Sequence, residues 1–153
     1  MHATETMLHS HPRADARRIH SSARVIDALA ICAAACAMCA DACLTEDEHV
    51  LTLRRCVRLN LECADACVVT GRMLSRQAEI PGALLHGQLQ VCVRACQFCA
   101  DECQGHAREH RHCRICAEIC RGAQAGCGHL LGVFSSEAVG ESVKPLDRAG
   151  LRR

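Results

Sequence analysis

Aromatic side chains are almost absent from this sequence. Among its 153 residues there is no tryptophan, no tyrosine and only two phenylalanines. The large side chains that usually fill a core are therefore scarce, and smaller residues must line much of the interior. Proline is also rare, with three residues, and β-branched runs are few. Both absences favour an all-α fold, and the length suits one domain with a modest core.

The sequence also lacks a marked excess of charge and a long apolar run. Its formal net charge is +1 at pH 7, and the basic residues form no long block. We therefore predict no nucleic-acid partner. No run reaches the roughly 18 apolar residues of a membrane span, so we predict no membrane association.

One stretch near the start of the chain is similar to an export signal. Arg17 and Arg18 precede an apolar stretch that begins at Val25, as in a twin-arginine signal. Asp27 interrupts that stretch, and the stretch contains the first row of cysteines, which cleavage would discard. We therefore predict a cytoplasmic protein, in a compartment where thiols stay reduced.

Cysteine is present in great excess, with 15 residues. In a short secreted chain this count would suggest a disulfide scaffold, but the odd number leaves at least one thiol unpaired. The cysteines also lie in helix-forming sequence, and neighbours on one helix are poorly directed toward each other for a disulfide bond. We therefore expect free thiols.

A short motif, Cys-Ala-acid-x-Cys, occurs four times, at 39–43, 63–67, 99–103 and 116–120. Each acid lies two residues from a cysteine, about 200° around a helix, and should point outward. Each copy lies in its own predicted helix, and polar turns or Pro81-Gly82 separate the helices. The predicted helices span residues 21–44, 48–77, 82–107 and 111–132, between tails at 1–20 and 133–153, with a candidate short helix at 13–20.

The cysteines recur at steps of three and four residues, the spacing of one face of a helix. Such apolar stripes face the axis of a helical bundle, and short connections favour up-down neighbours. We therefore predict an antiparallel four-helix bundle with a cysteine-lined lumen. The predicted lining residues are Cys32, Cys36, Cys39, Cys43, Cys56, Cys63, Cys67, Cys92, Cys96, Cys99, Cys103, Cys113, Cys116, Cys120 and Cys127.

The two ends of this bundle should differ in chemistry. His106 and His110 continue a cysteine stripe at one end and are candidate metal ligands, with His49 and His112 nearby. The other end should form an apolar plug. Its predicted members are Val25, Leu29, Leu74, Leu85, Leu89, Leu130 and Phe134. Between the ends, small cysteine side chains alone would leave the core underfilled, so we expect metal to fill it.

Thiolates in this number indicate a soft metal, of which Cu(I), zinc and iron–sulfur clusters are the candidates. Several zinc ions, each held by four thiolates, would leave several negatively charged sites in one low-dielectric core, which is costly. Cu(I) paired with one thiolate is neutral, and bridging thiolates would allow on the order of one copper per thiol, or ~15 per chain. A zinc- or iron–sulfur-binding regulatory or structural module with few ions remains the alternative. The usual iron–sulfur run C-x₂-C-x₂-C-x₃-C-P is absent, and the paired cysteines of zinc fingers lie mainly in turns.

An enzyme on a ferritin-like bundle is a further alternative, because such bundles use Glu-x-x-His motifs. Glu46–His49 and Glu109–His112 match this motif. Both lie at predicted helix ends, and no partner glutamates lie on the stripes at mid-bundle. We therefore predict that the protein is not an enzyme.

The complete rows of CxxxCxxCxxxC at 32–43 and 92–103 resemble those of the bacterial copper storage proteins, and the resemblance covers residues 21–132. It implies a four-helix bundle of the cytosolic type that stores many Cu(I) ions through cysteine, with histidine or methionine ligands where metal enters. It also implies a homo-oligomer, a tetramer of bundles. We expect a carrier, such as a copper chaperone, to deliver the metal by thiolate exchange. Asn60 and Ala123 depart from the pattern, because each takes a stripe position, and those levels should hold fewer coppers or use the Asn60 oxygen.

Overall fold

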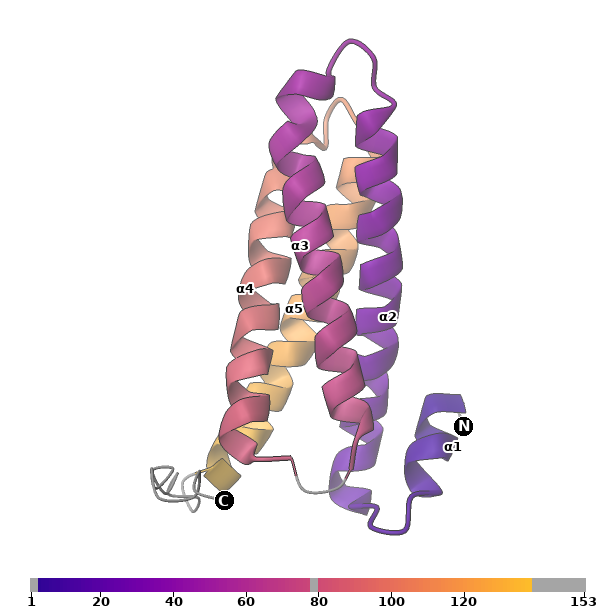
Figure 1. Cartoon of the computed structure of the whole chain (residues 1–153), viewed down its shortest axis with the longest axis vertical. Helices are drawn as coiled ribbons and strands as arrows, with labels where there is room; N and C mark the ends of the chain where they lie inside the picture. The colour runs from indigo at the N-terminus through magenta and orange to yellow at the C-terminus, as the bar shows by residue number, and fades with distance from the viewer. Residues whose placement is uncertain (1–2, 78–79, 139–153) are drawn as a thin grey trace, which may run out of the picture.

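The structure is a computed structural model that describes residues 3–77 and 80–138. Four long helices lie side by side, and a fifth, short helix lies beside one end of them (Figure 1). The helices are α1 (Ala3–His9), α2 (Ala16–Leu44), α3 (Val50–Ser75), α4 (Gly82–His106) and α5 (Arg111–Ala138). The predicted all-α class is confirmed.

The long helices form a closed ring in which each packs against two others. α2 contacts α3 and α5, and α4 contacts the same two helices from the other side. The α2–α3 and α4–α5 loops lie at one end of the bundle, and α3 ends and α4 begins at the other (Figure 1). This is the predicted antiparallel four-helix bundle. The first end carries His106, His110 and His112 and is called the imidazole end below; the opposite one is called the plug end.

The helix bounds differ from the predicted ones mainly in α2 and α5, the first and last helices of the bundle. α2 begins at Ala16, because the side chain of Asp15 caps it by accepting a hydrogen bond from the Arg17 amide at 3.1 Å. α5 continues to Ala138, because Phe134 remains on the inward face and packs into the core beyond the predicted end at residue 132. Residues 139–153 of the predicted C-terminal tail lie outside the described residues.

The segment predicted as an N-terminal tail contains α1. The candidate helix at 13–20 is not separate, because its second half belongs to α2. Leu8 of α1 packs on Ile19 and Ala23 of α2, and the three form a small second core. The first turn of α2 is therefore covered by α1 rather than left open.

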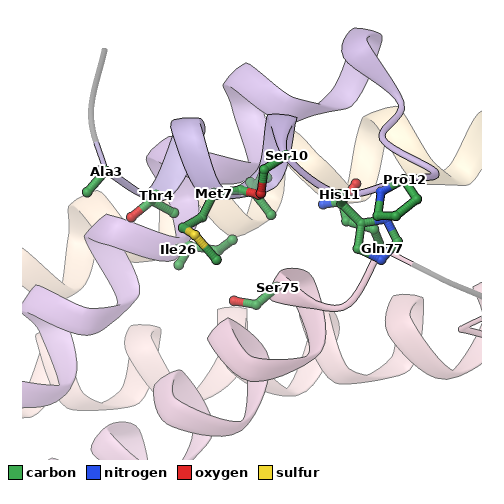
Figure 2. Close-up of a pocket in the computed structure, with 10 residues that line it drawn as sticks. Ala3, Thr4, Met7, Ser10, His11, Pro12, Ile26, Ser75 and Gln77 are labelled. Carbon is green, nitrogen blue, oxygen red and sulfur yellow. The ribbon is translucent and has the colours of Figure 1, made fainter.

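A surface pocket lies between α1, α2 and the end of α3 (Figure 2). Met7 of α1 and Ile26 of α2 lie close together in it, and Gln77 borders it from the α3 side. The ten residues that line the pocket include no cysteine. This pocket is therefore separate from the thiols of the bundle axis.

α2 is the only helix in the described part of the chain that is long and apolar enough to cross a membrane by composition. One such helix near the N-terminus is weak evidence, because the core helix of a bundle passes the same test. In this structure the cysteine stripe of α2 is buried against the other helices. The buried stripe thus accounts for part of the apolar character of α2.

The interior of the bundle follows the predicted stripes. All fifteen cysteines are buried, and the leucines Leu29, Leu89 and Leu130 form the centre of the apolar plug with exposed fractions of at most 1%. The acids of the four repeats all face solvent, as predicted; they are Asp41, Asp65, Asp101 and Glu118. Buried alanines beside the cysteines, such as Ala100 and Ala117, allow the helices to approach closely.

The plug end should stabilise the bundle without metal. Replacing Leu29 by alanine should lower the free energy of unfolding of the metal-free protein by about 2–5 kcal/mol, because the cavity left in the plug cannot fully collapse. Urea unfolding of the reduced protein, followed by circular dichroism, measures this change. Leu51→Ala is the control, because this side chain is 75% exposed and its loss should cost less than about 0.5 kcal/mol. A metal-free wild-type protein without helical signal would contradict the prediction.

Candidate metal centre

The fifteen thiols form one continuous array of sulfur atoms along the bundle axis. Neighbouring sulfurs on different helices lie in contact, with Sγ–Sγ distances of 3.5 Å for Cys36–Cys120 and for Cys56–Cys103. The contacts continue toward the plug end, where Cys96 lies 3.7 Å from the sulfur of Cys67. Sulfur atoms therefore touch one another where the sequence predicted an underfilled core. Metal would replace thiol protons within this array rather than enter an open tube.

The sulfurs gather in overlapping groups of four whose ligand atoms all lie within 4.8 Å of one another. Metal–thiolate bonds are about 2.3 Å long, so sulfurs that share one metal lie roughly 4 Å apart. Each group draws on three or four helices. The first group below shares members with the second and the third, and the fourth shares Cys39 and Cys113 with a group that contains His112. They are Cys32–Cys36–Cys63–Cys120, Cys32–Cys63–Cys67–Cys96, Cys36–Cys99–Cys116–Cys120 and Cys39–Cys56–Cys103–Cys113.

The thiols in this array cannot all ionise together, because they share hydrogen bonds in a buried core. Hydrogen bonds with Cys116 and Cys120, together with burial, raise the pKa of the Cys36 thiol. A hydrogen bond with Cys92 and burial likewise raise the pKa of Cys127. Hydrogen bonds from Cys113 and Cys116 lower the pKa of Cys103, because they stabilise its thiolate. A thiol next to a thiolate thus keeps its proton, which limits the charge in the core.

Asn60 occupies the stripe position that departs from the cysteine pattern, and its side chain is fully buried among thiols. Its Oδ1 accepts hydrogen bonds from Cys116 at 3.0 Å and Cys99 at 3.5 Å. Its Nδ2 donates to the sulfurs of Cys56 at 3.4 Å and Cys103 at 3.5 Å. The amide therefore provides hydrogen-bond partners for the thiols around it, and its oxygen lies among the sulfurs.

Ala123, the second departure from the pattern, is 1% exposed. Its methyl group belongs to the same core cluster as the surrounding cysteines. This position adds no sulfur to the array, so the array has fewer ligand atoms at that level.

At the imidazole end, His112 is the histidine that contacts the thiols directly. Its Nδ1 lies 3.4 Å from the sulfur of Cys113, 3.5 Å from that of Cys39 and 3.8 Å from that of Cys43. These four residues form a further group that could hold a metal ion. The sequence placed His112 at this end with His49, but only His106 and His110 were predicted ligands, because they continue the cysteine stripe. The position of His112 beside Cys113 in the first turn of α5 was the available signal.

The two histidines that the sequence did select lie at the same end but contact carboxylates. His110 is buried, and its Nδ1 lies 3.1 Å from Oε1 of Glu46. His106 is half-buried, and its Nε2 lies 3.4 Å from Oε1 of Glu102, which also binds Arg55 at 2.8 Å. The His110 ring lies 5.4 Å from the His112 ring and 6.4 Å from the His106 ring. The three imidazoles thus form a chain of neighbours that ends at the thiols.

The Glu-x-x-His matches do not assemble a mid-bundle carboxylate site. Glu46 lies in the α2–α3 loop and binds His110 and His112 rather than forming a pair with His49. Glu109 is exposed in the turn before α5. The motif that prompted a ferritin-like reading therefore belongs to the imidazole end of the thiol array.

Comparisons with known proteins agree with a helical bundle that binds metal through buried thiols. The family model described as copper storage protein matches residues 18–132. The copper storage protein Ccsp of Streptomyces lividans, solved with 10 copper equivalents, has 39% sequence identity and a TM-score of 0.81, covering 85% of this chain and 98% of that one. A comparison with curated protein sequences gave no significant match.

Two further structures of the Streptomyces lividans protein are similar to this chain. A form of this cytosolic copper storage protein with five coppers has 42% identity and a TM-score of 0.72, covering 74% of this chain and 93% of that one. A variant with one histidine replaced by alanine has 41% identity and a TM-score of 0.73, covering 75% of this chain and 95% of that one. With its bundle of buried thiols and a family match over most of its length, this chain belongs to the copper storage protein family.

Proposed function

We propose that this protein is a cytosolic store that sequesters many Cu(I) ions through its cysteine thiolates. The observation that carries this proposal is the continuous array of buried sulfurs, in which neighbouring groups of four share members. Shared members allow bridging thiolates, and bridging raises the number of ions that a fixed number of sulfurs can hold. A discrete structural or regulatory site would need only one such group.

The charge of the ion favours Cu(I) over zinc in this core. Each Cu(I) that replaces one thiol proton leaves the charge of the interior unchanged. A Zn²⁺ ion with four thiolates leaves an excess negative charge, and burying several such sites together is costly. Soft sulfur ligands also match the preference of Cu(I).

The proposed cytosolic location and the binding of many copper ions agree with what is known of the solved relative. The Streptomyces lividans protein has been solved with five and with 10 copper equivalents, and it is described as cytosolic. The free thiols of this chain suit the same reducing compartment. Storage requires tight binding and release but no chemical turnover, and we propose that the protein is not an enzyme.

We propose that copper enters at the imidazole end. All fifteen cysteines, together with His106 and His110, are the proposed ligands, and the contacts of His112 add it to this set. A copper chaperone would deliver the ion by thiolate exchange, and the imidazole chain would lead it to Cys43 and Cys113. The apolar plug closes the opposite end, so loading would proceed from the imidazole end inward.

Anaerobic titration of the reduced, metal-free protein with Cu(I) against a competing chelator should show tight uptake on the order of one copper per thiol. The triple variant Cys36→Ala, Cys96→Ala and Cys120→Ala should bind fewer ions, because it breaks groups in the middle of the array. Uptake that saturates at one or a few ions would instead support a zinc or regulatory site.

The control for this titration is Met38→Leu, which removes a soft thioether from a surface position that is 66% exposed. Its capacity should equal that of the wild-type protein. An unchanged capacity in the triple cysteine variant would refute storage in the thiol array.

Copper uptake should release protons, because thiols such as Cys36 and Cys127 have raised pKa values and are protonated at neutral pH. Cu(I) binds the thiolate, so an ion bound by such a thiol displaces its proton, and the affinity should fall as the pH falls. An indicator dye in weakly buffered solution should record protons as copper binds, with fewer than one per ion overall, because thiols such as Cys103 have a lowered pKa. The triple cysteine variant should release fewer. Uptake without proton release would show that the thiols are already ionised.

We further propose that the protein assembles as a homo-oligomer, a tetramer by family resemblance, through the exposed face of α3 and α4. This face carries two large apolar side chains, Val91 and Phe98, each at least 50% exposed. A groove between the two helices includes Val91 and Phe98 in its lining. Apolar patches of this kind commonly mark protein interfaces.

Light scattering should give a multiple of the 16.6 kDa chain mass for the wild-type protein. The double variant Val91→Asp and Phe98→Asp should shift the protein to monomers, because burying two carboxylates in the interface is costly. Leu51→Asp, exposed near the imidazole end, is the control and should leave the mass unchanged. A monomeric wild-type protein would contradict the proposal.

A further inference from the structure

Glu46 joins the two loops at the imidazole end of the bundle. It lies in the loop that follows α2, whereas His110 and His112 flank the start of α5 after the α4–α5 turn. Both loops lie at the same end (Figure 1). A single oxygen, Oε1 of Glu46, lies 3.1 Å from Nδ1 of His110 and 3.2 Å from Nε2 of His112.

This carboxylate determines which nitrogen of each imidazole carries the proton. A carboxylate oxygen only accepts hydrogen bonds, so each nitrogen that faces it must be the N–H. His110 is therefore protonated on Nδ1 and His112 on Nε2, which are opposite tautomers. Hydrogen bonds from His112 and His110 lower the pKa of Glu46, and the group is thus ionised at neutral pH.

The nitrogens left without a proton are the ones that can bind metal. In His112 this nitrogen is Nδ1, which faces the sulfurs of Cys113, Cys39 and Cys43 at 3.4–3.8 Å. In His110 it is Nε2. Histidine ligands in metal sites generally donate their other ring N–H to a carboxylate, which fixes the ring and its tautomer.

We propose that Glu46 is a positioning residue for copper loading, because one carboxylate oxygen holds His110 and His112 in opposite tautomers and turns Nδ1 of His112 toward the first thiols. The inference rests on the proposed Cu(I) storage. It identifies a residue outside the thiol array on which binding of the first copper ions depends. Without Glu46, the Nδ1–H form of His110 would lose its acceptor, and the ring of His112 would be free to turn. The deeper thiols do not depend on this contact.

The same arrangement recurs at His106. Its Nε2 faces Oε1 of Glu102, and Arg55 holds the other oxygen of that carboxylate at 2.8 Å. Nδ1 of His106 is therefore the nitrogen that can bind metal. Each of these three imidazoles thus has one nitrogen held by a carboxylate, which is the pattern expected of metal ligands.

Two measurements on the full chain test this role. Nitrogen-15 NMR of the imidazoles in the reduced, metal-free protein should show His110 protonated on Nδ1, and Glu46→Ala should shift it toward Nε2. In Glu46→Ala, the first Cu(I) equivalents should transfer from the Cu(I)–bicinchoninate complex about ten- to a hundredfold more slowly, or should bind with an affinity lowered by that factor. The total capacity should stay at the wild-type value, because the thiols are intact.

Two further variants separate hydrogen bonding from charge. Glu46→Gln keeps an acceptor oxygen and should retain more of the wild-type loading rate than Glu46→Ala. Glu48→Ala removes an exposed carboxylate of the same loop and should load like the wild-type protein. If Glu46→Gln loads as slowly as Glu46→Ala, the carboxylate acts through its charge alone and the proposal is overturned.

The remaining outcomes are equally distinct. Wild-type loading in Glu46→Ala, or Nε2 protonation of His110 in the wild-type protein, would overturn the role of Glu46 while leaving storage intact. A wild-type protein that binds only one or a few ions would overturn the storage function itself. Circular dichroism of each variant checks that its bundle is folded.

Discussion

The structure depends on keeping fifteen thiols buried together without accumulating charge. Sulfurs from different helices lie as close as 3.5 Å, as in Cys36 and Cys120, and each thiolate is surrounded by thiols that keep their protons. A low-dielectric core could not hold many thiolates at once. The array therefore carries limited charge without metal, and a soft monovalent ion that replaces one proton leaves that charge unchanged. This condition explains why the core accepts Cu(I) in number.

The scarcity of large core residues follows from the same condition. Sulfur–sulfur contacts need closely spaced helices, and buried alanines such as Ala35, Ala40 and Ala117 provide that spacing. Leucines and Phe134 at the plug end supply apolar packing that the few aromatic residues of the chain cannot supply elsewhere. Arg18 covers this end, with its guanidinium 5.0 Å from the Phe134 ring. The plug end thus contributes packing, and the rest of the bundle axis contributes thiols.

The two ends also differ in how polar groups are arranged. At the plug end the axis closes with leucine, whereas at the imidazole end carboxylates and imidazoles lead to the sulfurs. Glu46 lies 3.1 Å from Nδ1 of His110, and Glu102 lies 3.4 Å from Nε2 of His106. Asn60 continues this polar arrangement inside the array, where it bonds thiols on both sides of its amide. Polar groups along the axis are therefore arranged by hydrogen bonds as well as by contacts with sulfur.

The sequence by itself determined the fold class, the inward stripes and the different chemistry of the two ends. Steps of three and four residues fix which face of a helix is buried, and the positions of Leu29 and His106 along their helices fix the end at which each lies. Contacts between sulfurs such as those of Cys36 and Cys120 could not be predicted from the sequence. The two residues are 84 positions apart, and their contact depends on how the helices are rotated against each other. Only the tertiary structure brought His112, rather than a stripe residue, to the thiols and placed Glu46 across two loops, because loop geometry and ring orientation have no periodic signal in the chain.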